Sequence, residues 1–251
     1  ALMIFFVPYF YFCGLRLQLI FNVQHVRLGT RYIYFLRFIG MFFNNFLPSA
    51  VGGDLVSAYF ASKKTGKGVE CFTAILIDRI VGFFTIFLLA FIALFFQHEN
   101  LDLPYLKQIL IVIILAMVVT PFIFFSKRIA RPLKMLFLWL PAKVVDKLIA
   151  AYHAIYQYRH HPAALLIIIL TSICFQSLAI FVSYLSAVSM GMPISLWQCF
   201  YLLTIVWVAS MIPSLGGLGV REGAYVVLFQ SFGGPEKAFA MSLLYFSFTL
   251  V

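Results

Sequence analysis

The chain has 251 residues, of which 64% are hydrophobic, 18% are aromatic and only 10% are charged. Soluble domains carry about 25% charged residues, so this composition excludes a soluble enzyme, and the thirty phenylalanines exclude a disordered chain. In a soluble protein, a net charge of +10 would indicate binding to nucleic acid. Here Lys and Arg gather in loops between apolar blocks, as they do in membrane proteins, so we predict no nucleic-acid partner. The composition predicts an all-α polytopic membrane protein, with one transmembrane domain over residues 1–251.

The apolar blocks are about as long as a bilayer crossing requires. They predict membrane-spanning helices, in chain order, at residues 1–20, 73–96, 109–125, 163–188 and from 238 onwards. Two further apolar blocks are each divided by Pro and Gly into two short arms, at residues 32–47 with 55–62 and at residues 196–212 with 220–229. The sequence also begins and ends inside apolar blocks, so we expect it to be a piece of a longer protein.

The distribution of Lys and Arg predicts the orientation in the cell membrane. Loops rich in these residues are expected in the cytoplasm and loops without them outside. The cytoplasmic loops are then 22–31, 61–72 and 126–161, and the outer loops are 97–106 and 187–196. Apolar residues spaced three to four apart in 145–155 predict that 126–161 holds a basic amphipathic linker lying on the membrane surface. The linker separates a first half, 1–125, from a second half, 162–251.

This orientation makes each interrupted block enter and leave the membrane on one side. Segment 32–62 is therefore predicted to be a re-entrant hairpin from the inside, and segment 196–232 a re-entrant hairpin from the outside. The two breaks match, because Leu47-Pro48-Ser49 and Ile212-Pro213-Ser214 are each followed by a glycine pair. Matched broken helices of opposite direction indicate an inverted-topology repeat, typical of transporters. Alternatively, Pro-Ser and Gly-Gly are ordinary loop residues between spans.

The segments around these breaks resemble a known family. The stretches FFNNFLPSAVGGD, DRIVG and MIPSLGGLGVREGA are similar to the lysylphosphatidylglycerol synthase transmembrane (flippase) family, and the resemblance covers nearly the whole chain. It implies a membrane protein that moves anionic, aminoacylated or polyprenyl-linked lipids between leaflets. The soluble aminoacyl-transferase domain of the full synthases is absent from this sequence, so we do not expect the chain by itself to make lysyl-lipid.

The candidate substrate-binding residues lie at the breaks and in the DRIVG segment. Helices that begin after the glycines would present unpaired N–H groups and a partial positive charge to a lipid phosphate. Equally, the glycines allow tight turns and close helix packing. The candidates are Asn44, Asn45, Pro48, Ser49, Gly52, Gly53, Asp54, Asp78, Arg79, Pro213, Ser214, Gly216, Gly217, Gly219, Arg221 and Glu222.

The charged candidates each have a structural alternative. Asp54 and Glu222 are expected to contact a cationic headgroup or carry a proton, or else to cap their helices. Arg221 follows a run without charges from Pro162 to Val220 and is expected to hold a phosphate, with pairing to Glu222 as the alternative. Arg37 is expected to reach from the apolar block to the membrane interface, and the alternative is that Arg37 and Arg79 form a cytoplasmic vestibule for anionic lipid headgroups. Asp78 and Arg79 are expected to form ion pairs with neighbouring helices.

No catalytic residue, metal ligand set or cofactor motif is predicted, because the sequence has no nucleophile elbow, phosphate-binding loop or clustered His and acidic residues. The function favoured by the sequence is lipid translocation through a phosphate site at the middle of the membrane. The alternative is a membrane-embedded transferase subunit, or a scaffold, acting on lipid-linked substrates. Expected partners are a phospholipid or lipid-linked substrate, the bilayer itself, and a partner synthase or a second copy of the chain.

Overall fold

The computed structural model describes residues 2–47, 52–96, 108, 111, 115, 158–210 and 218–250. Every regular element within these ranges is helical. The helices, in chain order, are η1 (Leu2–Phe5), α1 (Phe6–Val23), α2 (Thr30–Phe46), α3 (Gly52–Thr65), α4 (Gly68–Phe96), η2 (Tyr158–His160), α8 (Pro162–Ser189), α9 (Leu196–Ala209), α10 (Val220–Phe229), η4 (Gln230–Phe232) and α11 (Pro235–Leu250).

The predicted all-α membrane fold is confirmed. Within the described part of the chain, three helices are long and apolar enough to cross a bilayer, namely Phe6–Val23, Gly68–Ala93 and Pro162–Ser189. Three predicted segments lie outside the described residues. They are the outer loop 97–106, the linker up to residue 157, and the span at 109–125 apart from positions 111 and 115. The Pro-Ser parts of both predicted breaks also lie outside the described residues. The candidate residues affected are Pro48, Ser49, Pro213, Ser214, Gly216 and Gly217.

Local sequence signals explain several helix ends. Pro162 occupies the first turn of α8, where its missing N–H removes no hydrogen bond. Ser195 and Gln198 form a capping box at the start of α9, with the Ser195 Oγ accepting from the Gln198 N–H at 3.2 Å and the Gln198 Oε1 accepting from the Ser195 N–H at 2.8 Å. Helix α4 begins at Gly68, five residues before the predicted span, with Glu70 in its first turn near the positive end of the helix dipole.

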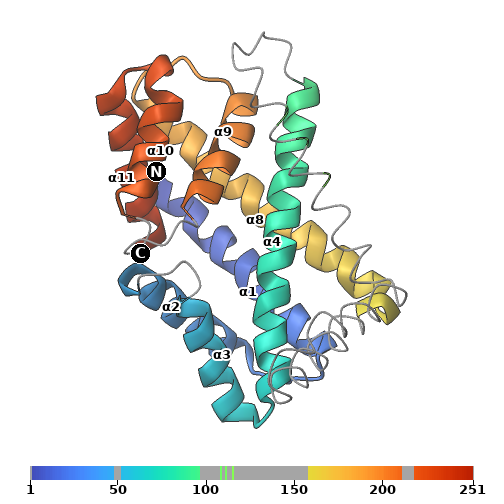
Figure 1. Cartoon of the computed structure of the whole chain (residues 1–251). Helices are drawn as coiled ribbons and strands as arrows, with labels where there is room; N and C mark the ends of the chain where they lie inside the picture. The colour runs from blue at the N-terminus through green and yellow to red at the C-terminus, as the bar shows by residue number, and fades with distance from the viewer. Residues whose placement is uncertain are drawn as a thin grey trace, which may run out of the picture.

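Helices α4 and α8 connect the two halves of the molecule. Figure 1 shows them crossing the whole bundle, with α1 beside them, α3 near the first part of α4 and α9 near its later part. One buried cluster includes Leu17, Ile20 and Ala74, and a second includes Ile86, Leu203 and Tyr225. Because α4 contributes to both clusters, the apolar packing of the two halves is continuous.

Helices α2 and α3 form a closely packed helical hairpin (Figure 1). They approach most closely at two glycines: a Cβ on Gly53 would stand 1.9 Å from the Gly40 carbonyl oxygen. Next to this crossing, the buried Ser57 hydroxyl donates to the Leu36 carbonyl at 2.8 Å. The glycines of the first break therefore serve close helix packing, one of the two roles that the sequence allowed.

Helix α10 packs between α9 and α11 in the second half. It begins after Gly219, which has φ +82°, a left-handed conformation that glycine adopts without strain. The observed limits of α10 are those predicted from the sequence, whereas α9 ends at Ala209, three residues before the predicted limit. Re-entry of the α2–α3 and α9–α10 pairs, and the inverted repeat, remain predictions.

Two predicted cytoplasmic loops lie together at one end of the bundle. The Lys67 ammonium donates to the His25 carbonyl at 2.7 Å, and Lys64 lies 3.8 Å from the centre of the Tyr32 ring. The end of the predicted linker is attached to the same end of the bundle, since the Tyr158 hydroxyl donates to the Ile20 carbonyl at 2.9 Å. Burial raises the pKa of Tyr158 above its ordinary value, so this donor stays protonated at neutral pH.

Candidate functional site

A cavity of about 350 Å³ lies among α1, α2, α3, α4, α8, α9 and α11. This volume is near the lower end of small-molecule sites, large enough for a headgroup but not for a whole lipid. Most of the wall is apolar, and its charged and polar side chains include Arg16, Arg37, Asp54, Asp78, Arg79 and Gln176. Charged side chains buried inside a membrane protein are costly and usually functional.

At one side of the cavity, two arginines bind the same carboxylate. Arg16 donates to Asp78 through Nε at 2.8 Å and Nη2 at 2.9 Å. Arg37 donates to the same two oxygens through Nη2 at 2.8 Å and Nη1 at 2.9 Å. Each arginine therefore uses the bidentate geometry that a planar guanidinium offers to an anion. We call Arg16, Arg37 and Asp78 the arginine cluster.

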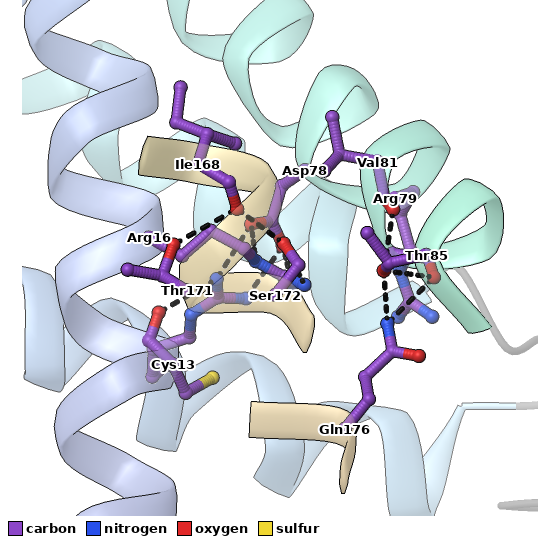
Figure 2. Close-up of polar contacts among 12 residues, drawn as sticks. Cys13, Arg16, Asp78, Arg79, Val81, Thr85, Ile168, Thr171, Ser172 and Gln176 are labelled. Atoms are coloured by element: carbon purple, nitrogen blue, oxygen red, sulfur yellow. Dashed lines mark hydrogen bonds and ion pairs between the residues drawn. The ribbon is translucent and has the colours of Figure 1, made fainter. Parts of the chain in front are cut away.

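The arginine cluster joins three helices and is held by a fourth. Arg16 comes from α1, Arg37 from α2 and Asp78 from α4, and the side chains of Arg16 and Asp78 are 6% and 5% exposed. Helix α8 also contacts Arg16. The Ser172 hydroxyl oxygen accepts from the Arg16 Nη1 at 3.4 Å, and the centre of the Phe175 ring lies 5.0 Å from the Arg16 guanidinium carbon. Figure 2 shows Arg16, Asp78 and Ser172 meeting between α1, α4 and α8.

Two more contacts connect the helices around the cavity. Arg79 of α4 forms an ion pair with Asp54 in the first turn of α3. On the other side, the Gln176 amide of α8 donates to the Gly82 carbonyl at 2.7 Å and to the Thr85 hydroxyl at 2.8 Å, both on α4 (Figure 2). The expectation that Asp78 and Arg79 pair with neighbouring helices is therefore met for both residues.

Residues next to both predicted breaks line this one cavity. Asn44 near the end of α2 and Asp54 at the start of α3 come from the first interrupted block, and Ser210 at the end of α9 comes from the second. The Asn44 Oδ1 accepts the Gly53 N–H at 2.8 Å, so this side chain caps the start of α3. Gly52 and Gly53 are buried, and the side chain of Asn45 lies outside the described part of the chain.

Arg221 and Glu222 stand apart from the cavity and bind each other. Neither is among the described residues that line it. The Arg221 Nη2 donates to the Glu222 Oε1 at 2.5 Å, and the centre of the Phe246 ring lies 4.3 Å from the Arg221 guanidinium carbon. The other carboxylate oxygen of Glu222 accepts the Gly219 N–H at 2.6 Å, capping α10. The observed contacts are those of the alternative roles of this pair, ion pairing and capping.

We expect Arg221→Gln to lower the free energy of unfolding by about 1–2 kcal/mol, because it leaves the buried Glu222 carboxylate without its cation. The double change Arg221→Gln with Glu222→Gln should recover part of that loss. Reversible unfolding in mixed micelles measures both changes. If the double variant is no more stable than the single one, Arg221 has a role beyond pairing with Glu222.

The arginine cluster was only partly predictable. The expectation that Arg37 reaches the membrane interface is wrong, because its side chain is 15% exposed and its guanidinium is bound to Asp78. Arg16 was missed as a site residue, although an arginine within the otherwise uncharged helix Phe6–Val23 was the available signal. Sequence spacing could not indicate that residues so far apart in the chain share one carboxylate.

The fold and the cavity define an all-α membrane protein with a buried, positively charged site. Within this class, the chain belongs to the lysylphosphatidylglycerol synthase transmembrane family, because the family model described as "Lysylphosphatidylglycerol synthase TM region" matches residues 1–251, the whole chain. The resemblance inferred from the breaks is thereby confirmed, and it places the protein in the context of membrane lipid modification. Comparison with curated proteins and with solved structures found no match.

Proposed function

We propose that this protein translocates lipids between leaflets, with the headgroup phosphate bound in the cavity beside the arginine cluster. The observation that carries the proposal is the meeting of two bidentate arginines, Arg16 and Arg37, at a cavity lined by residues from both interrupted blocks. Planar guanidinium groups match phosphate oxygens, and broken helices near the membrane centre are where transporters bind their substrates. The membrane-associated family of the chain is consistent with a lipid substrate.

The proposal includes the topology predicted from charge. The end of the bundle that carries Lys64 and Lys67 faces the cytoplasm, and the α2–α3 and α9–α10 pairs enter from opposite sides. The two pairs then bring their described ends, at Asn44 and Ser210, to one cavity from opposite leaflets. A headgroup held there is accessible in turn from either side when one pair moves against the other.

We expect Arg37→Gln to reduce lipid exchange severalfold and Arg37→Lys to reduce it less, since Lys keeps the charge but loses the planar pair of donors. Both variants leave Asp78 paired with Arg16, so the fold should be retained. The measurement is dithionite quenching of labelled phospholipids in proteoliposomes. Arg31→Gln, an exposed arginine of the same helix, is the matched control and should exchange lipid at the wild-type rate. Wild-type exchange in Arg37→Gln would rule out a phosphate site at this position.

A further inference from the structure

The α2–α3 hairpin turns a row of large apolar side chains away from the rest of the protein. Figure 1 shows the two helices at the edge of the bundle. Phe35 and Phe38 of α2 and Leu55 and Tyr59 of α3 are between 45% and 61% exposed, and none of these four residues lines the cavity. We call these four residues the hairpin face. In a membrane protein, such a face is covered by lipid or by another protein.

The exposed residues of α3 have the polarity of a phospholipid. Leu55, Tyr59 and Lys63 are spaced by four residues, so they follow one another along a single side of the helix, and all three are exposed. At 1.5 Å per residue, the row extends about 12 Å from Leu55 to Lys63. The hydrocarbon of one leaflet is about 15 Å thick. The row is therefore apolar over most of the depth of an acyl chain and cationic at its end.

A second lysine is fixed beside the hairpin face at the same end. The Lys64 ammonium lies 3.8 Å from the centre of the Tyr32 ring, which stacks on Phe35 with the ring centroids 5.4 Å apart. The Tyr32 hydroxyl donates to the Phe60 carbonyl of α3 at 3.0 Å, so this tyrosine joins the two helices. Tyrosines gather at the membrane–water interface. Tyr32 and Tyr59 therefore place Lys63 and Lys64 at the level of the lipid headgroups.

The two lysines have no anionic partner from the protein. Among the described residues, the ion pairs involve other side chains, and no carboxylate lies within salt-bridge distance of Lys63 or Lys64. Two neighbouring ammonium groups repel each other, and an anion between them removes that repulsion. Each lysine close to a membrane surface adds roughly fivefold to the affinity for anionic lipid.

We propose that the outer side of the α2–α3 hairpin binds one phospholipid with an anionic headgroup, its phosphate at Lys63 and Lys64 and its acyl chains along the hairpin face. The site lies outside the cavity, so this lipid is a resident one, and the inference does not depend on the proposed function. An acidic soluble segment would match the two lysines but would leave the hairpin face uncovered. A phospholipid satisfies both parts of the surface and contacts both helices.

A tryptophan introduced by Phe35→Trp reports which lipid lies beside the hairpin face. The full chain, with its three native tryptophans replaced by phenylalanine, is reconstituted in mixtures of phosphatidylcholine and phosphatidylglycerol, one of them brominated in its acyl chains. Bromine quenches only a tryptophan that it can touch. We expect phosphatidylglycerol to bind here at least about tenfold more tightly than phosphatidylcholine, because two lysines contribute. A ratio near one overturns the proposal, and so does the absence of quenching by either lipid, which would mean that protein covers the face.

Charge variants in the same background assign the preference to the two lysines. Lys63→Gln with Lys64→Gln should reduce the ratio to about one, whereas Lys63→Arg with Lys64→Arg should keep it. Lys237→Gln, an exposed lysine in the first turn of α11, is the matched control and should leave the ratio unchanged. An unchanged preference in the double glutamine variant contradicts the proposal, as does an equal loss in Lys237→Gln. Quenching by both lipids in the double variant shows that the hairpin face remains folded against the membrane.

Discussion

Asp78→Asn is expected to lower the free energy of unfolding by about 3–5 kcal/mol, the cost of leaving buried charges without their partner. The carboxylate is the common acceptor for Arg16 and Arg37, and the residue is 4% exposed. An asparagine carries no charge, and its amide nitrogen would face N–H donors that need an acceptor. Reversible unfolding in mixed micelles, followed by tryptophan fluorescence, measures the change.

Two further variants make this expectation specific. Glu236→Gln, in the exposed first turn of α11, removes an acid with no such role and should change stability by less than about 0.5 kcal/mol. Adding Arg37→Gln to Asp78→Asn should recover part of the loss, because only Arg16 then remains unpaired. Wild-type stability in Asp78→Asn would mean that the arginine cluster does not hold α1, α2 and α4 together.

Gly53→Ala is expected to destabilise the protein by about 3 kcal/mol, the upper part of the usual range for overpacking. The added methyl group would stand 1.9 Å from the Gly40 carbonyl oxygen and 2.8 Å from the Asn44 backbone nitrogen. Both atoms belong to the backbone of α2 and cannot turn away, so the two helices must separate. Separation also weakens the hydrogen bond from the Ser57 hydroxyl to Leu36.

The matched control is Gly223→Ala, because Gly223 is also helical and an added Cβ there meets nothing within 4 Å. That change should stabilise the protein by up to about 1 kcal/mol through helix propensity alone. Thermal unfolding of both variants in the same detergent compares them directly. Equal behaviour of the two variants would show that the α2–α3 crossing tolerates separation and that Gly53 is not a packing residue.

Because the arginine cluster and the α2–α3 crossing share helix α2, the proposed lipid binding would be connected to helix packing. Arg37 and Gly40 are less than one turn apart on α2, so a shift of the crossing moves Arg37 relative to Asp78. Variants at Gly53 should therefore be compared with Arg37 variants in the exchange assay as well as in unfolding. A change in exchange at Gly53 does not by itself place that glycine against the lipid.

The amino-acid sequence alone determined the class of this protein and most of its helices. The long apolar blocks predicted α1, α4 and α8, because a lipid environment requires each span to satisfy its own backbone hydrogen bonds. The Pro and Gly residues predicted that two apolar blocks each form a pair of short helices, observed as α2 with α3 and α9 with α10, although α3 begins earlier than predicted, at Gly52, and α9 ends earlier, at Ala209. The stretches around the same breaks carried the family resemblance.

Only the tertiary structure decided which charges belong together. Arg16 and Arg37 contact Asp78 across separations of 62 and 41 residues, and no local pattern encodes such a distance. The expectation that Arg37 reaches the interface failed for the same reason. An isolated arginine near the end of a span lowers its free energy by reaching water, but a buried carboxylate from another helix offers a stronger contact. Whether that carboxylate is present depends on how α1, α2 and α4 pack, which is a property of the whole fold.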